Sequence, residues 1–287
     1  MKKNLFIKST LILICSGFLT KILGFVIKVI YTRIIGEYGI SLYAIAAPTY
    51  SLLLTIATLA IPISISKLVS ENKGRSIRIL TSAAFLILFI NFLLILIILL
   101  TRNFLATTLL KEPLASPILL AFALTLPFVS ISSVLKGYFA GKQNMVPHAT
   151  SNIIEQIIRL IIIVIVLPIL MEKSVMHAII GLILLTIISE ISSIIVFLFF
   201  IPKHINFKTN LLPSKKHTKD ILNISVPTVS SRIIGNIGYF LEPIILTNLL
   251  LFSGYPSSYI LHEYGAYNAY SLALLTMPGF FIAAIST

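Results

Sequence analysis

The feature that most constrains this chain is a series of apolar runs, each roughly 20 residues long. A helix of that length crosses a hydrocarbon core of about 30 Å. Charged residues make up only 11% of the chain, whereas a soluble domain carries about 25% and needs them to cover its surface. We therefore predict an all-α, polytopic transmembrane helical bundle embedded in a lipid bilayer.

The apolar runs predict eight spans. They lie near residues 9–35, 41–66, 79–100, 117–136, 147–170, 176–201, 220–250 and 266–287. The second span holds Pro48 and Pro62, and the seventh holds Pro227 and Pro243. Because proline interrupts the helical hydrogen-bond ladder, we expect both spans to be kinked.

The net charge of +13 could suggest a nucleic-acid partner, but the basic residues form no aromatic-interleaved patch. They alternate along the chain instead. Fourteen of the 22 Lys and Arg residues fall in the N-terminal segment and every second connection after it, four fall in the other connections, and four lie inside spans. Because basic loops stay in the cytoplasm, this pattern predicts a bacterial inner-membrane protein with a cytoplasmic N-terminus.

A weak internal repeat suggests two related halves. Residues 21–24 (KILG) correspond to 232–235 (RIIG), and the sequence Glu-Tyr-Gly occurs at both 37–39 and 263–265. Six spans separate the two copies. An even number keeps their orientation parallel, so the halves would be related by an axis along the membrane normal.

The repeat predicts how the chain is divided. We expect a first six-helix lobe at 1–201, a basic cytoplasmic linker at 202–219, and the start of a second lobe, with about two spans, at 220–287. The second lobe would then be incomplete. We expect the chain to be a fragment or truncated product of a protein with twelve or more spans.

Lys21 and Lys28 are the first candidates for function, because charge inside a membrane is costly. They are seven residues apart, so they share one helix face with Gly17 and Gly24. A stripe of cations and glycines on an apolar helix is typical of a water-filled cavity that receives an anion. The alternative is that each lysine reaches the membrane interface along its own stem.

Arg232 occupies the repeat-equivalent position in the seventh span, with Asn236 and Tyr239 at helical spacing after it. A cation there could face Lys21 and Lys28 across a central cavity, and an arginine can bind a phosphate with two hydrogen bonds. The alternative is a structural ion pair between Arg232 and Glu242.

Three carboxylates and an arginine are secondary candidates: Glu155, Arg159, Glu190 and Glu242. Glu155 and Arg159 are four residues apart, which favours an intrahelical ion pair. Glu190 has no partner in its own helix. It could bind a proton or a sodium ion, or it could be a hydrogen-bonded structural carboxylate.

No signature of an enzyme occurs in the sequence. We find no phosphate-binding P-loop, no nucleophile elbow and no His/Cys set with metal-ligand spacing. We therefore expect no catalytic residue, no bound metal and no cofactor.

Five stretches of the chain resemble a known family. Residues 135–147 (LKGYFAGKQNMVP) and 154–159 (IEQIIR) are similar to the connection between the fourth and fifth spans of the stage V sporulation protein B group of polysaccharide biosynthesis proteins. Residues 21–26, 33–36 and 61–69 also resemble that group. The group belongs to the multidrug/oligosaccharidyl-lipid/polysaccharide (MOP) exporter superfamily, which includes murein lipid-precursor flippases.

The resemblance implies a two-lobe transporter fold, like that of the multidrug exporters of the MATE type, and alternating access between the lobes. It also implies export of an undecaprenyl-diphosphate-linked saccharide, such as a peptidoglycan or cell-surface polysaccharide precursor. The family's cavity cations would match Lys21, Lys28 and Arg232. We expect a coupling ion (Na⁺ or H⁺) or the membrane potential to drive transport, by a monomer when full length.

Two other functions remain open. A cation-coupled multidrug exporter could use the same architecture, although it would need carboxylates in the cavity, and the leading candidates here are basic. A non-transporting fragment or membrane scaffold is the third possibility, because the family carries a complete second lobe and this chain does not.

Overall fold

The computed structural model describes residues 2–71, 76–201, 213–272 and 275, and all of its regular elements in these ranges are helical. Six of the described helices are long and apolar enough to cross a membrane. The fold is therefore an all-α transmembrane bundle, as predicted. Its elements are α1 (Lys2–Thr58), α2 (Ile61–Glu71), α3 (Ser76–Phe104), η2 (Leu105–Leu109), α4 (Ala115–Gly141), α5 (Val146–Lys173), α6 (Val175–Phe200), α8 (Lys215–Phe252), α9 (Ser257–Ala266) and η3 (Tyr267–Ser271).

Helix α1 contains the first predicted span and most of the second. The division between them falls at Gly36, whose φ of 75° and ψ of 176° are not helical. A residue with a side chain rarely adopts such a positive φ, whereas glycine does so without strain. Gly36 therefore turns the chain back into the membrane within one residue.

The second predicted span is interrupted close to Pro62. Leu59 and Ala60 have φ values of 47° and 49°, and α2 begins at Ile61. Pro62 is thus the second residue of α2, where a helix needs no backbone N–H. The amide of Asn91 in α3 donates a hydrogen bond of 3.2 Å to the carbonyl of Ala57, an end carbonyl of α1 that would otherwise be unpaired.

The other three prolines do not interrupt their helices. Pro48 lies inside α1, and Pro227 and Pro243 lie inside α8, and in each case the helical assignment continues on both sides. A helix is thus interrupted at one of the four prolines, where the chain passes from α1 to α2. A kink without interruption at the other three stays a prediction.

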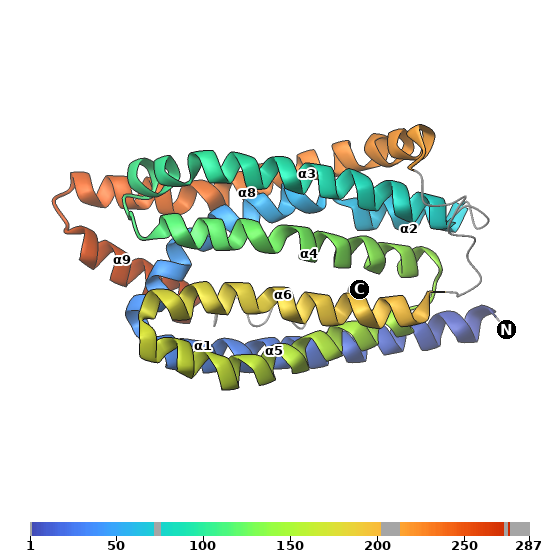
Figure 1. The fold of residues 1–287 in the computed structure, drawn as a ribbon, viewed down its shortest axis with the longest axis horizontal. Helices are drawn as coiled ribbons and strands as arrows, with labels where there is room; N and C mark the ends of the chain where they lie inside the picture. Colours follow the sequence, from blue (N-terminus) through green and yellow to red (C-terminus); the bar gives the residue numbers. More distant parts are fainter. Residues whose placement is uncertain (1, 72–75, 202–212, 273–274, 276–287) are drawn as a thin grey trace.

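The long helices lie lengthwise beside one another (Figure 1). The first part of α1 runs along α5, and α4 and α6 lie between this pair and a group formed by α2, α3 and α8. The N-terminus, the end of α2, the α4–α5 turn and the start of α8 gather at one end of the bundle, which we call the N-terminal end. The turn at Gly36 and the start of α9 lie at the opposite end, the Gly36 end.

This arrangement brings the predicted basic connections to the N-terminal end. Those that are described there include Lys67, Arg78, Lys136, Lys142 and Lys216. Lys73, Arg75, Lys203 and Lys208 lie outside the described residues. Which end faces the cytoplasm remains a prediction from charge.

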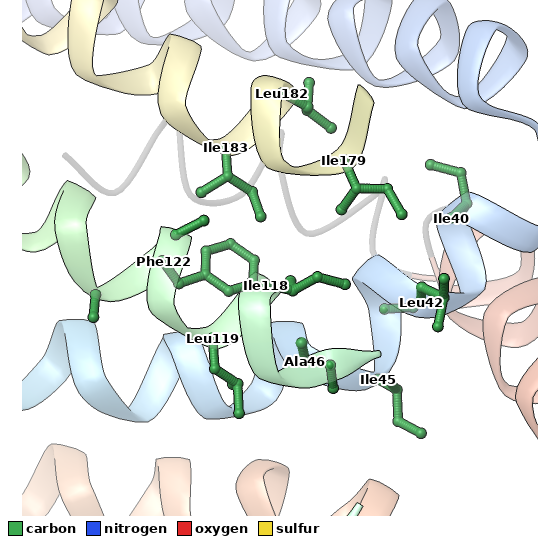
Figure 2. Close-up of a cluster of buried hydrophobic side chains, with 14 of the residues drawn as sticks. Ile40, Leu42, Ile45, Ala46, Ile118, Leu119, Phe122, Ile179, Leu182 and Ile183 are labelled. Atoms are coloured by element: carbon green, nitrogen blue, oxygen red, sulfur yellow. The ribbon is translucent and has the colours of Figure 1, made fainter. Parts of the chain in front are cut away.

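Side chains from α1, α4 and α6 form the main core at the Gly36 end. Figure 2 shows Phe122 of α4 among Ile118, Leu119 and Ile183, with Ala46 of α1 beside them. The outward surface is apolar as well: the side chain of Phe89 is 62% exposed and that of Phe199 is 80% exposed. In a soluble protein such a surface would aggregate, so these faces are the ones that meet lipid.

Helices α8 and α9 pack on the first six spans at several places. The hydroxyls of Ser64 and Ser225 lie 2.7 Å apart between α2 and α8, and both residues are buried. At the Gly36 end, a Cβ added to Gly265 would lie 2.5 Å from Cα of Ser41. The side chain of Asn236 in α8 makes a further contact, with Ser51 and Thr55 of α1.

The predicted division into lobes stays a prediction. Most of the 202–219 linker lies outside the described residues, and α8 begins at Lys215. The last predicted span, 266–287, is described only through Leu272 and at Leu275.

An exposed histidine links the Gly36 end of α1 to α9. Nε2 of His262 lies 3.2 Å from Oε2 of Glu37, and Nδ1 lies 3.5 Å from Oε1 of Glu263. The hydrogen bond to Glu37, with the added charge of Glu263, raises the pKa of His262 above 6.5. Because the pKa of His262 is raised in the folded state, the ion pair's contribution to stability is fully present below pH 6.5. That contribution is lost as the pH rises through the folded-state pKa of His262.

We expect Glu37→Gln to lower the pKa of His262 toward its ordinary value, because the largest cause of the shift is then gone. NMR titration of protein carrying ¹³C-labelled histidine would measure it, and Glu112→Gln, which lies away from His262, is the control. A His262 pKa that is the same in wild type and Glu37→Gln would contradict this assignment.

Candidate functional site

An ion-pair network joins three helices inside the first six spans. Nη2 of Arg159 lies 3.0 Å from Oε1 of Glu155, one turn earlier on α5, and 3.8 Å from Oε1 of Glu190 on α6. Nε of Arg159 donates a hydrogen bond of 3.1 Å to Oγ of Ser189. Nζ of Lys136 on α4 lies 3.4 Å from Oε2 of Glu155. Arg159 is therefore the centre of the network, and it holds α5 against α6.

One of these contacts follows from the sequence and the other three do not. Glu155 and Arg159 form the ion pair expected from their spacing of four. Glu190 was expected to lack a partner in its own helix, and its partner comes from α5. Lys136 is 19 residues from Glu155 along the chain, and sequence spacing gave no reason to pair them.

A cavity of about 440 Å³ lies beside this network, between α1, α4, α5 and α6. Cations, carboxylates and tyrosines line it together with apolar side chains. The charged residues and tyrosines in the lining include Lys28, Tyr43, Tyr50, Glu155, Arg159 and Glu190. The ring of Tyr50 stacks on Phe122 at a centroid distance of 4.4 Å, and that of Tyr43 meets Phe122 edge-on at 5.4 Å. These aromatic contacts hold together an apolar part of the cavity wall.

A second cavity, of about 190 Å³, lies where α1 meets α8 and η3. Its lining includes Lys28, Tyr31, Tyr43, Tyr239 and Asn268. Nζ of Lys28 donates a hydrogen bond of 3.5 Å to the backbone carbonyl of Asn268. Lys28, Tyr31 and Tyr43 line both cavities, so they stand at the boundary between the first six spans and the helices that follow.

The three predicted cavity cations, Lys21, Lys28 and Arg232, lie in different environments. Lys28 lines both cavities, whereas the side chains of Lys21 and Arg232 are exposed. One turn after Arg232, the amide of Asn236 accepts a hydrogen bond from Ser51 at 2.9 Å and donates one to Thr55 at 3.1 Å. These contacts tie that turn of α8 to the second part of α1, and the first part of α1, which carries the lysines, lies elsewhere in the bundle.

Glu242, the remaining candidate, is half-buried in α8. Within the described part of the chain it forms no ion pair with Arg232, so the alternative of a structural Arg232–Glu242 bridge finds no support. A separation of ten residues also places the two almost three turns apart on the helix.

Several residues around the cavities were not predicted. Tyr31, Tyr43 and Tyr50 were overlooked because tyrosine carries no formal charge. A signal was present, since Tyr43 and Tyr50 are seven residues apart, the same spacing that picked out Lys21 and Lys28. Asn268 contributes through its backbone carbonyl, and no side-chain pattern could have identified it.

The sequence as a whole matches a known family. The family described as "Polysaccharide biosynthesis protein" matches residues 6–287. Stage V sporulation protein B of Bacillus subtilis (strain 168) is 35% identical over 299 residues, which cover 100% of this chain and 58% of that protein. Lipid II flippase MurJ of the same organism is 28% identical over 168 residues, 54% of this chain and 31% of that protein. The expected resemblance is confirmed.

The fold also matches a solved structure. A multidrug resistance MATE family transporter of the MOP superfamily, in an outward-facing conformation, superposes with a TM-score of 0.69 at 16% identity. The superposition covers 99% of this chain and 62% of that one. At this identity the likeness establishes the fold, which is the expected transporter fold of the MATE type.

The chain covers about three fifths of the length of the relatives that it matches over its whole length. The cavities described above are therefore formed by the part of the fold that this chain contains.

Proposed function

This chain belongs to the polysaccharide biosynthesis protein family, and from that premise we propose that it works in a membrane transporter that flips an undecaprenyl-diphosphate-linked saccharide. A peptidoglycan or cell-surface polysaccharide precursor fits this description. The similarity to a protein named lipid II flippase supports the choice of a lipid-linked saccharide over other exported molecules.

The observation that carries the proposal is the place of Lys28. This lysine lines both the cavity within the first six spans and the cavity against α8 and η3. A diphosphate that passed between the lobes would meet its charge, and a lysine inside a membrane is costly unless an anion or water receives it. Arg159 lines the first cavity as well, but its charge is already shared between Glu155 and Glu190.

Alternating access gives the contacts at the Gly36 end a role in this proposal. With a cytoplasmic N-terminus, this end would face outward. Gly265 against Ser41 and His262 against Glu37 would then close the outer side of the pathway. Release of the saccharide would require both contacts to separate.

We expect Lys28→Gln, introduced into the full-length protein, to reduce flipping at least about tenfold, since losing one charged contact costs about 1.5–3 kcal/mol. Proteoliposomes containing a fluorescent undecaprenyl-diphosphate saccharide would measure the rate. Lys28→Arg should retain part of the activity because it keeps the charge. Lys111→Gln, at the Gly36 end and away from both cavities, is the matched control.

Normal flipping by Lys28→Gln would reject the role of Lys28. Parallel changes at Lys21 and Arg232, the other two predicted cations, test whether exposed positions in this structure contribute in another state of the transport cycle. If both have normal rates while Lys28→Gln is slow, the substrate contact is confined to Lys28 among the three.

A cation-coupled multidrug exporter is the second candidate, because Glu155 and Glu190 do line the first cavity. Both carboxylates are paired with Arg159, which leaves less negative charge for a cationic drug. Drug efflux by a sensitised host, lost on Glu190→Gln, would favour this function over the flippase. Absence of both activities in the full-length protein would favour a non-transporting scaffold.

A further inference from the structure

Helices α2 and α4 pack closely near the junction where α4 ends and α5 begins, in residues 135–147. Two glycines one turn apart hold this end of α4 against α2. A Cβ added to Gly137 would lie 2.6 Å from Cα of Pro62, and one added to Gly141 would lie 2.7 Å from the carbonyl oxygen of Ser66. Small residues spaced by four allow this close approach of two membrane helices, and it brings the lysines of both helices to one place.

A pocket of about 470 Å³ opens at this junction, and we call it the α2–α4–α5 pocket. Helix α2 contributes Ser66, Lys67 and Ser70, α4 contributes Lys136, and α5 contributes His148. The volume is in the range of small-molecule sites, about 300–1,000 Å³. The pocket is separate from the two cavities described above, which do not share its lining residues.

The charge in the pocket is positive. Among the described residues, its lining includes two lysines and no carboxylate. Lys136 is partly neutralised, because its Nζ lies 3.4 Å from Oε2 of Glu155. Lys67 is exposed and forms no ion pair with any described residue, so its charge is available to a ligand.

The polar groups around Lys67 suit a phosphate. Lysine binds phosphate as a point charge, and the hydroxyl of Ser66 can add a neutral hydrogen bond. The hydroxyl of Ser70 donates to the backbone carbonyl of Lys67 at 2.7 Å and holds that turn of α2 together. The pocket lies near the N-terminal end of the bundle, where α2 and α4 end and α5 begins (Figure 1). Lipid phosphates lie at this level, where the spans leave the hydrocarbon core.

We propose that the α2–α4–α5 pocket is a binding site for a phosphate or diphosphate group, held by Lys67 with Lys136 and Ser66. The ligand can be the head group of a lipid or a free diphosphate, since the chemistry is the same. The inference does not depend on transport: a phospholipid held there would stabilise the bundle even in a protein that flips nothing.

The test measures binding to the purified protein in detergent micelles, with three separate probes: inorganic diphosphate, undecaprenyl diphosphate and phosphatidylglycerol. Isothermal calorimetry suits the first probe and native mass spectrometry the two lipids. Lys67→Gln should weaken binding of at least one probe about tenfold, the factor that corresponds to about 1.4 kcal/mol. Lys67→Arg should retain binding, because it keeps the charge.

Lys216→Gln is the matched control. Lys216 is also an exposed lysine near the N-terminal end, but it lies on α8 and does not line the pocket. An effect of Lys67→Gln on inorganic diphosphate would show that the head group alone is recognised. An effect on one lipid only would show that the source is that lipid, with its chain contributing.

Two results would overturn the proposal. One is that none of the three probes binds to the wild-type protein. The other is that Lys67→Gln and Lys216→Gln weaken binding equally, which would indicate general attraction to a basic surface. Because flipping is not measured, a failure here leaves the proposed transport function untouched, and a failure of the flipping test leaves this pocket standing.

Discussion

Arg159→Met should lower the free energy of unfolding by about 3 kcal/mol, the lower end of the cost of breaking a buried ion pair. Arg159 contacts both Glu155 and Glu190, whose side chains are each only 7% exposed. Removing the guanidinium leaves two carboxylates close together in the membrane interior with no arginine to pair them. The cost is at the lower end of the range for buried ion pairs because the side chain of Arg159 itself is 22% exposed. Reversible unfolding in mixed micelles would measure the change.

A rescue variant separates this cause from simple loss of packing. When Arg159→Met is combined with Glu155→Gln and Glu190→Gln, both buried carboxylates lose their charge together with the arginine, and the one charge left in the network is that of Lys136, which is 25% exposed. We expect most of the lost stability to return, because a neutral set of similar volume often replaces a buried ion pair without cost. Arg33→Met, at an exposed position, is the control for loss of one arginine. Equal stability of Arg159→Met and wild type would show that the network holds nothing together.

Gly137→Ala should destabilise the protein by about 1–3 kcal/mol, the usual cost of adding atoms to a well-packed interface. The new methyl group would lie 2.6 Å from Cα and 2.7 Å from the carbonyl oxygen of Pro62. Both are backbone atoms, so no side chain can rotate away, and α2 must shift from α4. The loss should appear in thermal unfolding of the purified protein.

Gly238→Ala is the matched control for this change. Gly238 also lies inside a long helix, α8, and a Cβ there would meet nothing within 4 Å. Alanine favours a helix over glycine by roughly 0.5–1 kcal/mol, so Gly238→Ala should be neutral or slightly stabilising. If the two variants had the same stability, the close approach of α2 and α4 would be unimportant.

Features that depend on one segment of the chain could be predicted from the sequence. The helical spans were predictable because a run of apolar residues identifies a span without reference to any other part of the chain. Glu155 and Arg159 were predictable as a pair because both lie on one helix, where spacing fixes direction. Gly36 was included in a matching motif, but its backbone conformation, on which the turn depends, is visible only in the structure.

Contacts between different helices could not be predicted from the sequence. Lys21 and Lys28 share one face of one helix, and sequence periodicity treats them alike. The structure separates them, since Lys28 reaches Asn268 while Lys21 is exposed. Which part of a face meets another helix depends on packing between segments far apart in the sequence.

The sequence by itself determined that this chain is an all-α membrane protein, that its basic connections alternate, and that it resembles the family to which it belongs. Each of these depends on composition or on local spacing. Only the tertiary structure decided that Arg159 joins Glu155 to Glu190 and that Lys28 lines two cavities. It also decided that Lys67 and Lys136, 69 positions apart in the chain, share one pocket. The physical reason is that hydropathy is a property of single segments, whereas a charged site in a membrane is formed by several helices packed together.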